Sequence, residues 1–81
     1  MINDVKRVVG STLGLGPRAD AMDASTPLLG AIPELDSMAV VSLITALEER
    51  FGIAVDDDEI GADHFETLGS LVSFVEQKLA R

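Results

Sequence analysis

The sequence predicts an all-α fold, an up-down four-helix bundle with a long first loop and a short third helix. Apolar residues recur at helical spacing in three segments, and no segment alternates apolar and polar residues over the length of a strand. The chain of 81 residues has room for one hydrophobic core, so residues 1–81 are expected to form a single domain. Because only 4% of the residues are aromatic, Leu, Ile, Val and Ala must supply most of that core.

The first helix is expected to run from about Asn3 to Leu15. Asn3 is the expected N-cap, and Gly14, Gly16 and Pro17 are expected to end the helix. The predicted buried stripe consists of Ile2, Val5, Val8, Val9 and Leu13.

Residues 17–35 show no clear periodicity, which predicts a long loop. Loops of this length are unusual inside a compact domain. The second half of the segment is too apolar for a solvated linker, so we expect an ordered crossover. The residues expected to pin it to the core are Leu28, Leu29, Ile32 and Leu35.

The second helix is expected to run from Ser37 to Phe51, about 22 Å at a rise of about 1.5 Å per residue. Asp36 is the expected N-cap and Gly52 the expected stop. The predicted buried stripe consists of Val40, Val41, Ile44, Leu47 and Phe51, with Leu43 at its edge.

Two further helices are expected after this one. A short helix should begin in the acidic run 56–59, capped by Asp56 or Asp57, and break near Gly61. The last helix should begin with Thr67 as its cap. Its predicted inner face consists of Leu68, Leu71, Val72, Val75 and Leu79, with Phe74 close by.

The composition excludes several function classes. The formal net charge of −8 disfavours binding to nucleic acid or anionic lipid and favours basic partners. With no cysteine, the chain can form neither a disulfide nor a thiolate metal site, so any functional thiol must come from an attached group. No apolar run can span a membrane, and residues 1–16 lack the core of a signal peptide. We therefore expect a cytoplasmic monomer without membrane insertion.

Ser37 is the main candidate functional residue. Its hydroxyl should lie in the first turn of a helix, beside unpaired backbone N–H groups and the positive end of the helix dipole. That position stabilises a phosphate ester formed on the hydroxyl. An Asp-Ser pair before a helix is most often only a cap, so the residues alone leave both interpretations open.

The acidic run is a poor match to a calcium loop. Asp56, Asp58 and Gly61 have the spacing of an EF-hand, but Ile60 stands at a ligand position and Thr67 where a bidentate Glu belongs. We therefore expect a solvated helix start and no metal site, while weak divalent-cation binding that relieves repulsion between the acids stays open.

His64, the only histidine, could be written into a triad with Ser37. No nucleophile-elbow glycines flank the serine, and the spacing gives no support for the triad. We expect no catalytic residue.

Several segments together match a known family. They are Leu35-Asp36-Ser37-Met38, residues 47–53 (LEERFGI), residues 56–60 (DDDEI), residues 65–68 (FETL) and Leu71-Val72. In these segments the chain resembles the acyl carrier protein family, which includes the related peptidyl carrier domains. The resemblance covers nearly the whole domain, and the second helix is its most specific part.

The resemblance implies a site and its chemistry. Ser37 would be the attachment point of 4′-phosphopantetheine, which a separate phosphopantetheinyl transferase takes from coenzyme A, and Asp36 matches the acidic residue before it. The arm would supply the thiol that holds acyl groups as thioesters, so the protein itself would not be an enzyme. Acyl-transferring or acyl-activating enzymes would contact the surface formed by Met38, Val41, Ser42, Thr45, Glu48 and Glu49.

The chain departs from the family in one place. Carriers of bulk fatty-acid synthesis usually have acidic residues early on the exposed face of the second helix, where this chain has Ala39 and Ser42. Since charge guides recognition by basic partners, we expect a specialised lipid or secondary-metabolite pathway. An aminoacyl or peptidyl carrier is one alternative. An unmodified acidic helical interaction module, with Ser37 only a cap, is another.

Overall fold

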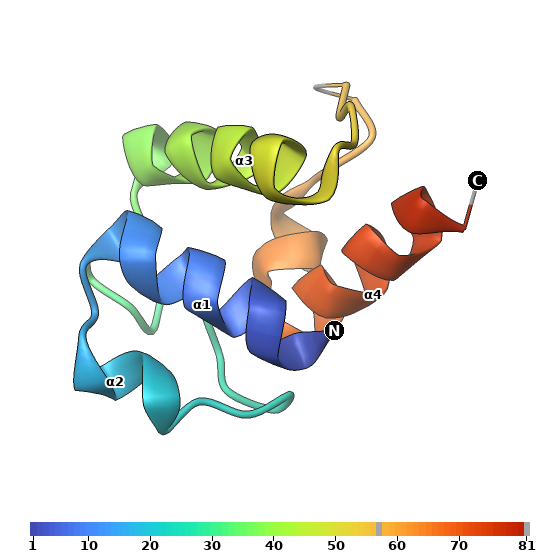
Figure 1. The fold of residues 1–81 in the computed structure, drawn as a ribbon. Coiled ribbons are helices and arrows are strands. Elements are labelled where there is room, and N and C mark those ends of the chain that lie inside the picture. The colour runs from blue at the N-terminus through green and yellow to red at the C-terminus, as the bar shows by residue number, and fades with distance from the viewer. Residues whose placement is uncertain (57, 81) are drawn as a thin grey trace.

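The computed structural model describes residues 1–56 and 58–80, which form a helical bundle. Its elements are α1 (Ile2–Leu13), α2 (Pro17–Asp20), α3 (Ser37–Phe51), the 3-10 helix η1 (Ala62–Phe65) and α4 (Leu68–Leu79). Within the described ranges there is no strand, only one isolated bridge between Pro27 and Thr67. In Figure 1, α1 lies between α2 and α3 and runs opposite to α3. The predicted all-α bundle is confirmed.

The core is built around α1, which packs on α2, α3 and α4. Val5 and Val9 of α1 are fully buried, and they belong to one apolar cluster with side chains from the long loop, α3 and α4. The other side chains that are fully buried or nearly so are Leu28, Leu43, Leu47, Leu68, Leu71 and Val75. Since burying one such side chain contributes about 1.5–3 kcal/mol, this cluster holds the helices together.

The ends of α1 differ partly from the expectation. The helix begins at Ile2 with Met1 as N-cap, so the prediction of Asn3 as the cap is wrong. The backbone N–H of Asp4 bonds to the carbonyl of Met1 instead, which starts the helix without a side-chain cap. The helix ends at Leu13 and not at the expected Leu15, because Gly14, one of the residues expected to end it, adopts a left-handed conformation with φ of 66°.

The long segment 17–35 is ordered, as predicted, but it is not entirely a loop. Its first residues form α2, a single helical turn with Pro17 at its first position. α2 lies tight against α1, since a Cβ added to Gly10 would meet the Cβ of Ala19 at 2.6 Å.

Backbone hydrogen bonds hold the second half of this segment in place. Leu28 and Leu29 donate to the carbonyls of Glu66 and Phe65, at 3.0 and 2.9 Å. In return, Leu68 and Gly69 donate to the carbonyls of Thr26 and Ala24, at 2.9 and 2.8 Å. The segment therefore runs along the junction between η1 and α4, with the Leu28 side chain fully buried.

α3 has the predicted bounds, Ser37–Phe51. The predicted buried stripe is partly wrong, because Val41 is 63% exposed whereas Leu43, placed at the edge, is fully buried. The buried line runs through Leu43 and Leu47, and Val40, Ile44 and Phe51 pack beside it only partly buried.

The short helix lies later than predicted. The proposed cap Asp57 lies outside the described residues, and Asp56 precedes no helix, so the prediction that a helix begins in the acidic run and breaks near Gly61 is wrong. η1 begins after Gly61 instead and carries the buried Phe65.

α4 begins at Leu68 with Thr67 as its N-cap, as predicted. The Thr67 hydroxyl accepts the N–H of Ser70, and the Ser70 hydroxyl accepts the N–H of Thr67. Its inner face contains Leu68, Leu71, Val72, Phe74 and Val75. Leu79, predicted to be part of that face, is 44% exposed because the helix extends past the core.

Candidate functional site

Ser37 is the first residue of α3, and it is exposed. Asp36, the residue before it, is in an extended conformation and accepts the N–H of Ala39 on Oδ1 at 2.8 Å. The Asp36 carbonyl accepts the N–H of Val40 at 2.9 Å. The N–H groups of Ser37 and Met38 have no partner among the described residues. An ester phosphate on Ser37 would thus lie at a helix N-terminus with donors to spare.

The order of these residues explains the geometry. An Asp in the extended region favours the N-cap position, because its carboxylate can reach the donor three residues on. Capping at Asp36 therefore fixes Ser37 as the first helical residue and leaves its side chain facing water. The same contact gives Asp36 a structural role at the site.

A pocket of about 340 Å³ lies beside Ser37. Apart from Ser37, its lining is formed by Leu29, Val40, Ile60, Gly61, Ala62 and Phe65. These residues come from the long loop, α3, and the segment that ends in η1, so the hydrogen bonds of the long loop also shape the site. No local pattern predicts this pocket, since its lining residues are neighbours only in the folded chain.

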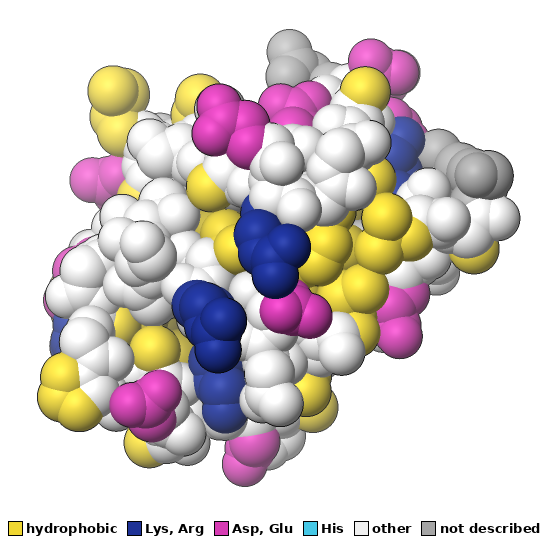
Figure 2. Space-filling model, viewed as in Figure 1, with side chains coloured by type: hydrophobic (Ala, Val, Ile, Leu, Met, Phe, Trp, Pro, Cys, Tyr) yellow, Lys and Arg dark blue, Asp and Glu magenta, His cyan; other side chains and the backbone are white. Residues whose placement is uncertain are grey.

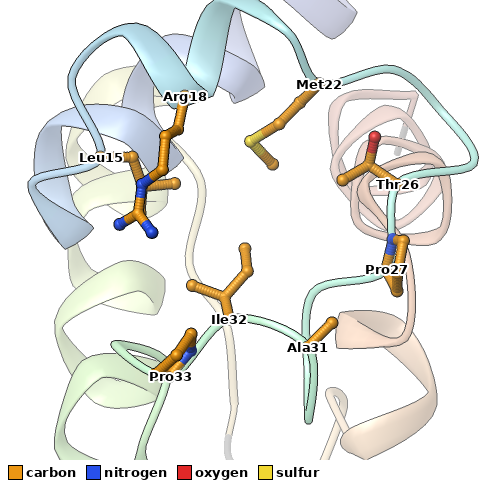
Figure 3. A pocket seen from close by; sticks show the side chains of 8 residues that line it. All are labelled: Leu15, Arg18, Met22, Thr26, Pro27, Ala31, Ile32 and Pro33. Carbon is orange, nitrogen blue, oxygen red and sulfur yellow. The ribbon is translucent and has the colours of Figure 1, made fainter.

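A second cavity, of about 280 Å³, lies away from Ser37 and is mainly apolar. Figure 3 shows Leu15, Arg18 and Met22 on one side of it, with Ile32 and Pro33 facing them from the long loop. The guanidinium of Arg18 forms an ion pair with Glu34. Ser37 does not line this cavity.

The predicted partner surface is mostly exposed. Met38 is 78% and Val41 63% exposed, and Ser42, Thr45 and Glu49 are exposed as well. Ala39, which we placed on that face, is instead partly buried against the core. The first two turns of α3 therefore present apolar and neutral side chains to water.

Glu48 differs from its neighbour Glu49. It is half-buried, and its Oε2 accepts the N–H of Val55 at 2.8 Å. Glu48 therefore holds the segment after α3 against that helix, a role that sequence reasoning missed because Val55 is not a helical neighbour.

The charges are unevenly distributed on the surface. On the face shown in Figure 2, several lysines and arginines form a column that crosses α1, others lie toward the edges of the view, and acidic side chains are scattered around them. Arg7 and Arg50 line a shallow pocket between α1 and α3, and Arg50 also pairs with Asp4 at 3.0 Å.

The two other candidate sites gain no support. His64 packs its ring on Phe74, with centroids 4.8 Å apart. Among the residues that the structure describes, no group of acidic or histidine side chains could hold a metal ion.

No described helix is long and apolar enough to cross a membrane.

Comparisons with known proteins identify the family. A family model described as "Phosphopantetheine attachment site" matches residues 3–75. Acyl carrier proteins of Sulfurovum sp. and Wolinella succinogenes are 38% and 35% identical to this chain over 77 residues, which are 94% of this chain and 95% and 93% of theirs. The chain belongs to the acyl carrier protein family. A holo acyl carrier protein of Nitrosomonas europaea, solved by NMR in solution, is 59% identical. Its TM-score is 0.93, and the match covers 99% of this chain and 96% of that one.

Family membership establishes the general function of the protein. The protein is an acyl carrier that bears covalent 4′-phosphopantetheine, and members of this family carry acyl groups and do not catalyse reactions. The alternative of an unmodified interaction module is therefore set aside. The exposed N-terminus of α3 fits a phosphate ester, and the chain without cysteine would depend on the arm for its thiol.

Proposed function

We propose that Ser37 is the residue that carries the phosphopantetheine arm. The observation that carries this proposal is an exposed hydroxyl on the first residue of a capped helix, beside an apolar pocket. In the first turn, the free N–H groups and the helix dipole would stabilise the phosphate next to the protein. The arm supplies the thiol on which an acyl group is held as a thioester.

The surrounding residues would have distinct tasks. Asp36 caps α3 and thereby presents the Ser37 hydroxyl to a phosphopantetheinyl transferase that uses coenzyme A. Leu29, Val40, Ile60 and Phe65 offer an apolar lining that could exclude water from an acyl chain.

We further propose that partner enzymes contact the outer face of α3. This face contains Met38, Val41, Ser42, Thr45, Glu48 and Glu49. Exposed apolar side chains at its start favour a partner that recognises it by shape and apolar contact, with charge contributing only in the last turns. Acyl-transferring or acyl-activating enzymes are the expected partners of a cytoplasmic monomer.

The neutral start of this face also supports a dedicated lipid or secondary-metabolite pathway. The test is a fatty-acid synthase assay in which this protein, with its phosphopantetheine arm attached, replaces the housekeeping carrier. We expect slow elongation, with partial recovery when Ser42 is changed to Glu. Elongation as fast as with the housekeeping carrier would contradict the proposal.

The alternative is that the protein carries aminoacyl or peptidyl groups, since the neutral face of α3 is compatible with loading by an adenylating enzyme. To separate the acyl carrier from the aminoacyl carrier, the protein with its phosphopantetheine arm attached is incubated with a fatty acid and its ligase and, separately, with amino acids and adenylating enzymes. Acylation only by the fatty-acid ligase supports the acyl carrier that the curated relatives suggest.

A further inference from the structure

One wall of the pocket beside Ser37 belongs to the segment between α3 and η1. Ile60 and Gly61 line the pocket from this wall, together with Val40 of α3 and Leu29 of the long loop. Since Val40 and Ser37 are fixed in α3, the position of residues 60–61 determines how wide the pocket is.

The residue just before this wall is anchored to a different helix. Both carboxylate oxygens of Glu59 lie within hydrogen-bond distance of the Lys78 ammonium, at 2.9 and 2.8 Å. Oε1 of Glu59 also accepts the N–H of Asp56 at 3.0 Å. Lys78 lies in the last turn of α4. The wall of the pocket is thus held by a helix that does not carry Ser37.

This ion pair is better protected from water than the other two described in the chain. The side chains of Lys78 and Glu59 are only 11% and 20% exposed. Those of Arg50 and Asp4 are 50% and 42% exposed, and those of Arg18 and Glu34 are 56% and 37% exposed. Exposed ion pairs are screened by solvent and contribute little free energy. Charge-assisted hydrogen bonds between partly buried side chains contribute more and fix the positions of both partners.

The start of the same segment is anchored separately, because Glu48 of α3 accepts the N–H of Val55. Val55 is thus bonded to α3 and Glu59 to α4, and Ile60 and Gly61 directly follow the second of these two anchors. Breaking only the second anchor would free the part that lines the pocket and leave the first part in place.

We infer that the Glu59–Lys78 ion pair is a positioning element that sets the width of the pocket beside Ser37 and so determines which linear aliphatic acyl chains it shelters. This inference rests on the proposed attachment at Ser37. With the ion pair formed, Ile60 closes on the apolar lining and a chain in the pocket is kept from water. Without it, the wall moves outward, and the chain loses the burial that would stabilise it.

The first test uses the unmodified protein and needs no acyl group. Lys78→Met removes the charge and keeps a long apolar stem, and Glu59→Gln removes the charge of the partner and keeps its shape. Loss of a charge-assisted hydrogen bond predicts that the two hydrogen-bonded amides at this anchor, those of Asp56 and Glu59, exchange about tenfold to a hundredfold faster. Arg50→Met, which breaks an exposed pair, is the matched control and should leave these amides unchanged. Exchange at the wild-type rate in both variants would overturn the inference.

The second test uses protein loaded with butyryl, octanoyl or palmitoyl groups, after intact mass has confirmed loading. We expect an octanoyl group to raise the melting temperature of the wild type and of Arg50→Met above that of the same protein with the phosphopantetheine arm but no acyl group. Lys78→Met and Glu59→Gln should lose most of this rise. An equal rise in all four proteins, or none in the wild type, would overturn the inference. Failure of the proposed function would appear differently, as wild-type protein that gains no mass or gains it away from Ser37.

Discussion

The carboxylate of Glu48 accepts a hydrogen bond from the backbone N–H of Val55, 2.8 Å away. This contact joins the last turns of α3 to the segment that leads toward the pocket beside Ser37. Glu49, the next residue, is exposed and makes no such bond among the described contacts. Two adjacent acidic residues, both expected on the partner surface, thus have different structural roles.

Glu48→Ala should destabilise the protein. It leaves the half-buried N–H of Val55 without its charged acceptor, which costs about 1–2 kcal/mol in free energy of unfolding. Glu49→Ala, the matched control, should change it by less than about 0.5 kcal/mol. Urea denaturation of both variants measures the difference, and equal effects would show that the Val55 contact contributes nothing.

Asp36 is predicted to have two separable roles. Asp36→Ala removes the acceptor for the Ala39 N–H and should cost about 1 kcal/mol of stability. Asp36→Asn keeps an N-cap acceptor and should fold with nearly wild-type stability. If the transferase also recognises the negative charge, both variants should be loaded more slowly, measured as the rate of mass gain from coenzyme A. Loading of Asp36→Asn at the wild-type rate would restrict Asp36 to capping.

Gly69 is expected to tolerate no side chain. It lies in α4, where a Cβ would come within 2.7 Å of the Ala24 carbonyl oxygen and so disturb the loop that packs there. Gly69→Ala should therefore lose about 1–3 kcal/mol, although alanine by itself favours a helix by about 1 kcal/mol. Ser73→Ala, at an exposed position of the same helix, should be neutral or slightly stabilising. A stabilised Gly69→Ala protein would contradict this packing.

Asp23 should make stability depend on pH in acid. The Ser25 hydroxyl, the Ser25 N–H and the Thr26 hydroxyl donate to its carboxylate and hold its pKa below the ordinary value of 3.8. A lowered pKa means that the unfolded chain takes up the proton first as the pH falls. The contribution of Asp23 is therefore complete above about pH 4 and is lost as the pH drops through the lowered pKa. Melting curves should show wild type above Asp23→Asn at neutral pH, with the gap closing in acid. A gap that is constant with pH would count against these hydrogen bonds.

Where local chemistry sets the structure, the sequence was sufficient to predict it. The bounds of α3 follow from the cap at Asp36 and from Gly52, whose φ of 65° ends the helix. The position of Ser37 followed directly from those bounds. The match to the carrier family then supplied the chemistry that the residues alone had left open.

Where distant contacts set the structure, prediction failed. The acidic run resembled a helix start, but the Glu59 carboxylate bonds to Lys78 in α4, and η1 begins only after Gly61. α2 is one turn long and too short for periodicity, although Pro17 after Gly16 was a usable signal. Val41 and Leu43 exchanged roles because the burial of α3 depends on where α1 packs, which no helical pattern specifies.

The attachment of phosphopantetheine to Ser37 is tested most directly by peptide mass spectrometry. The wild type and Ser37→Ala are incubated with coenzyme A and a phosphopantetheinyl transferase, then digested and fragmented. The account predicts one phosphopantetheine group on the wild type, located on Ser37, and none on Ser37→Ala. A modified Ser37→Ala protein, or a wild-type group located on any other residue, would contradict it.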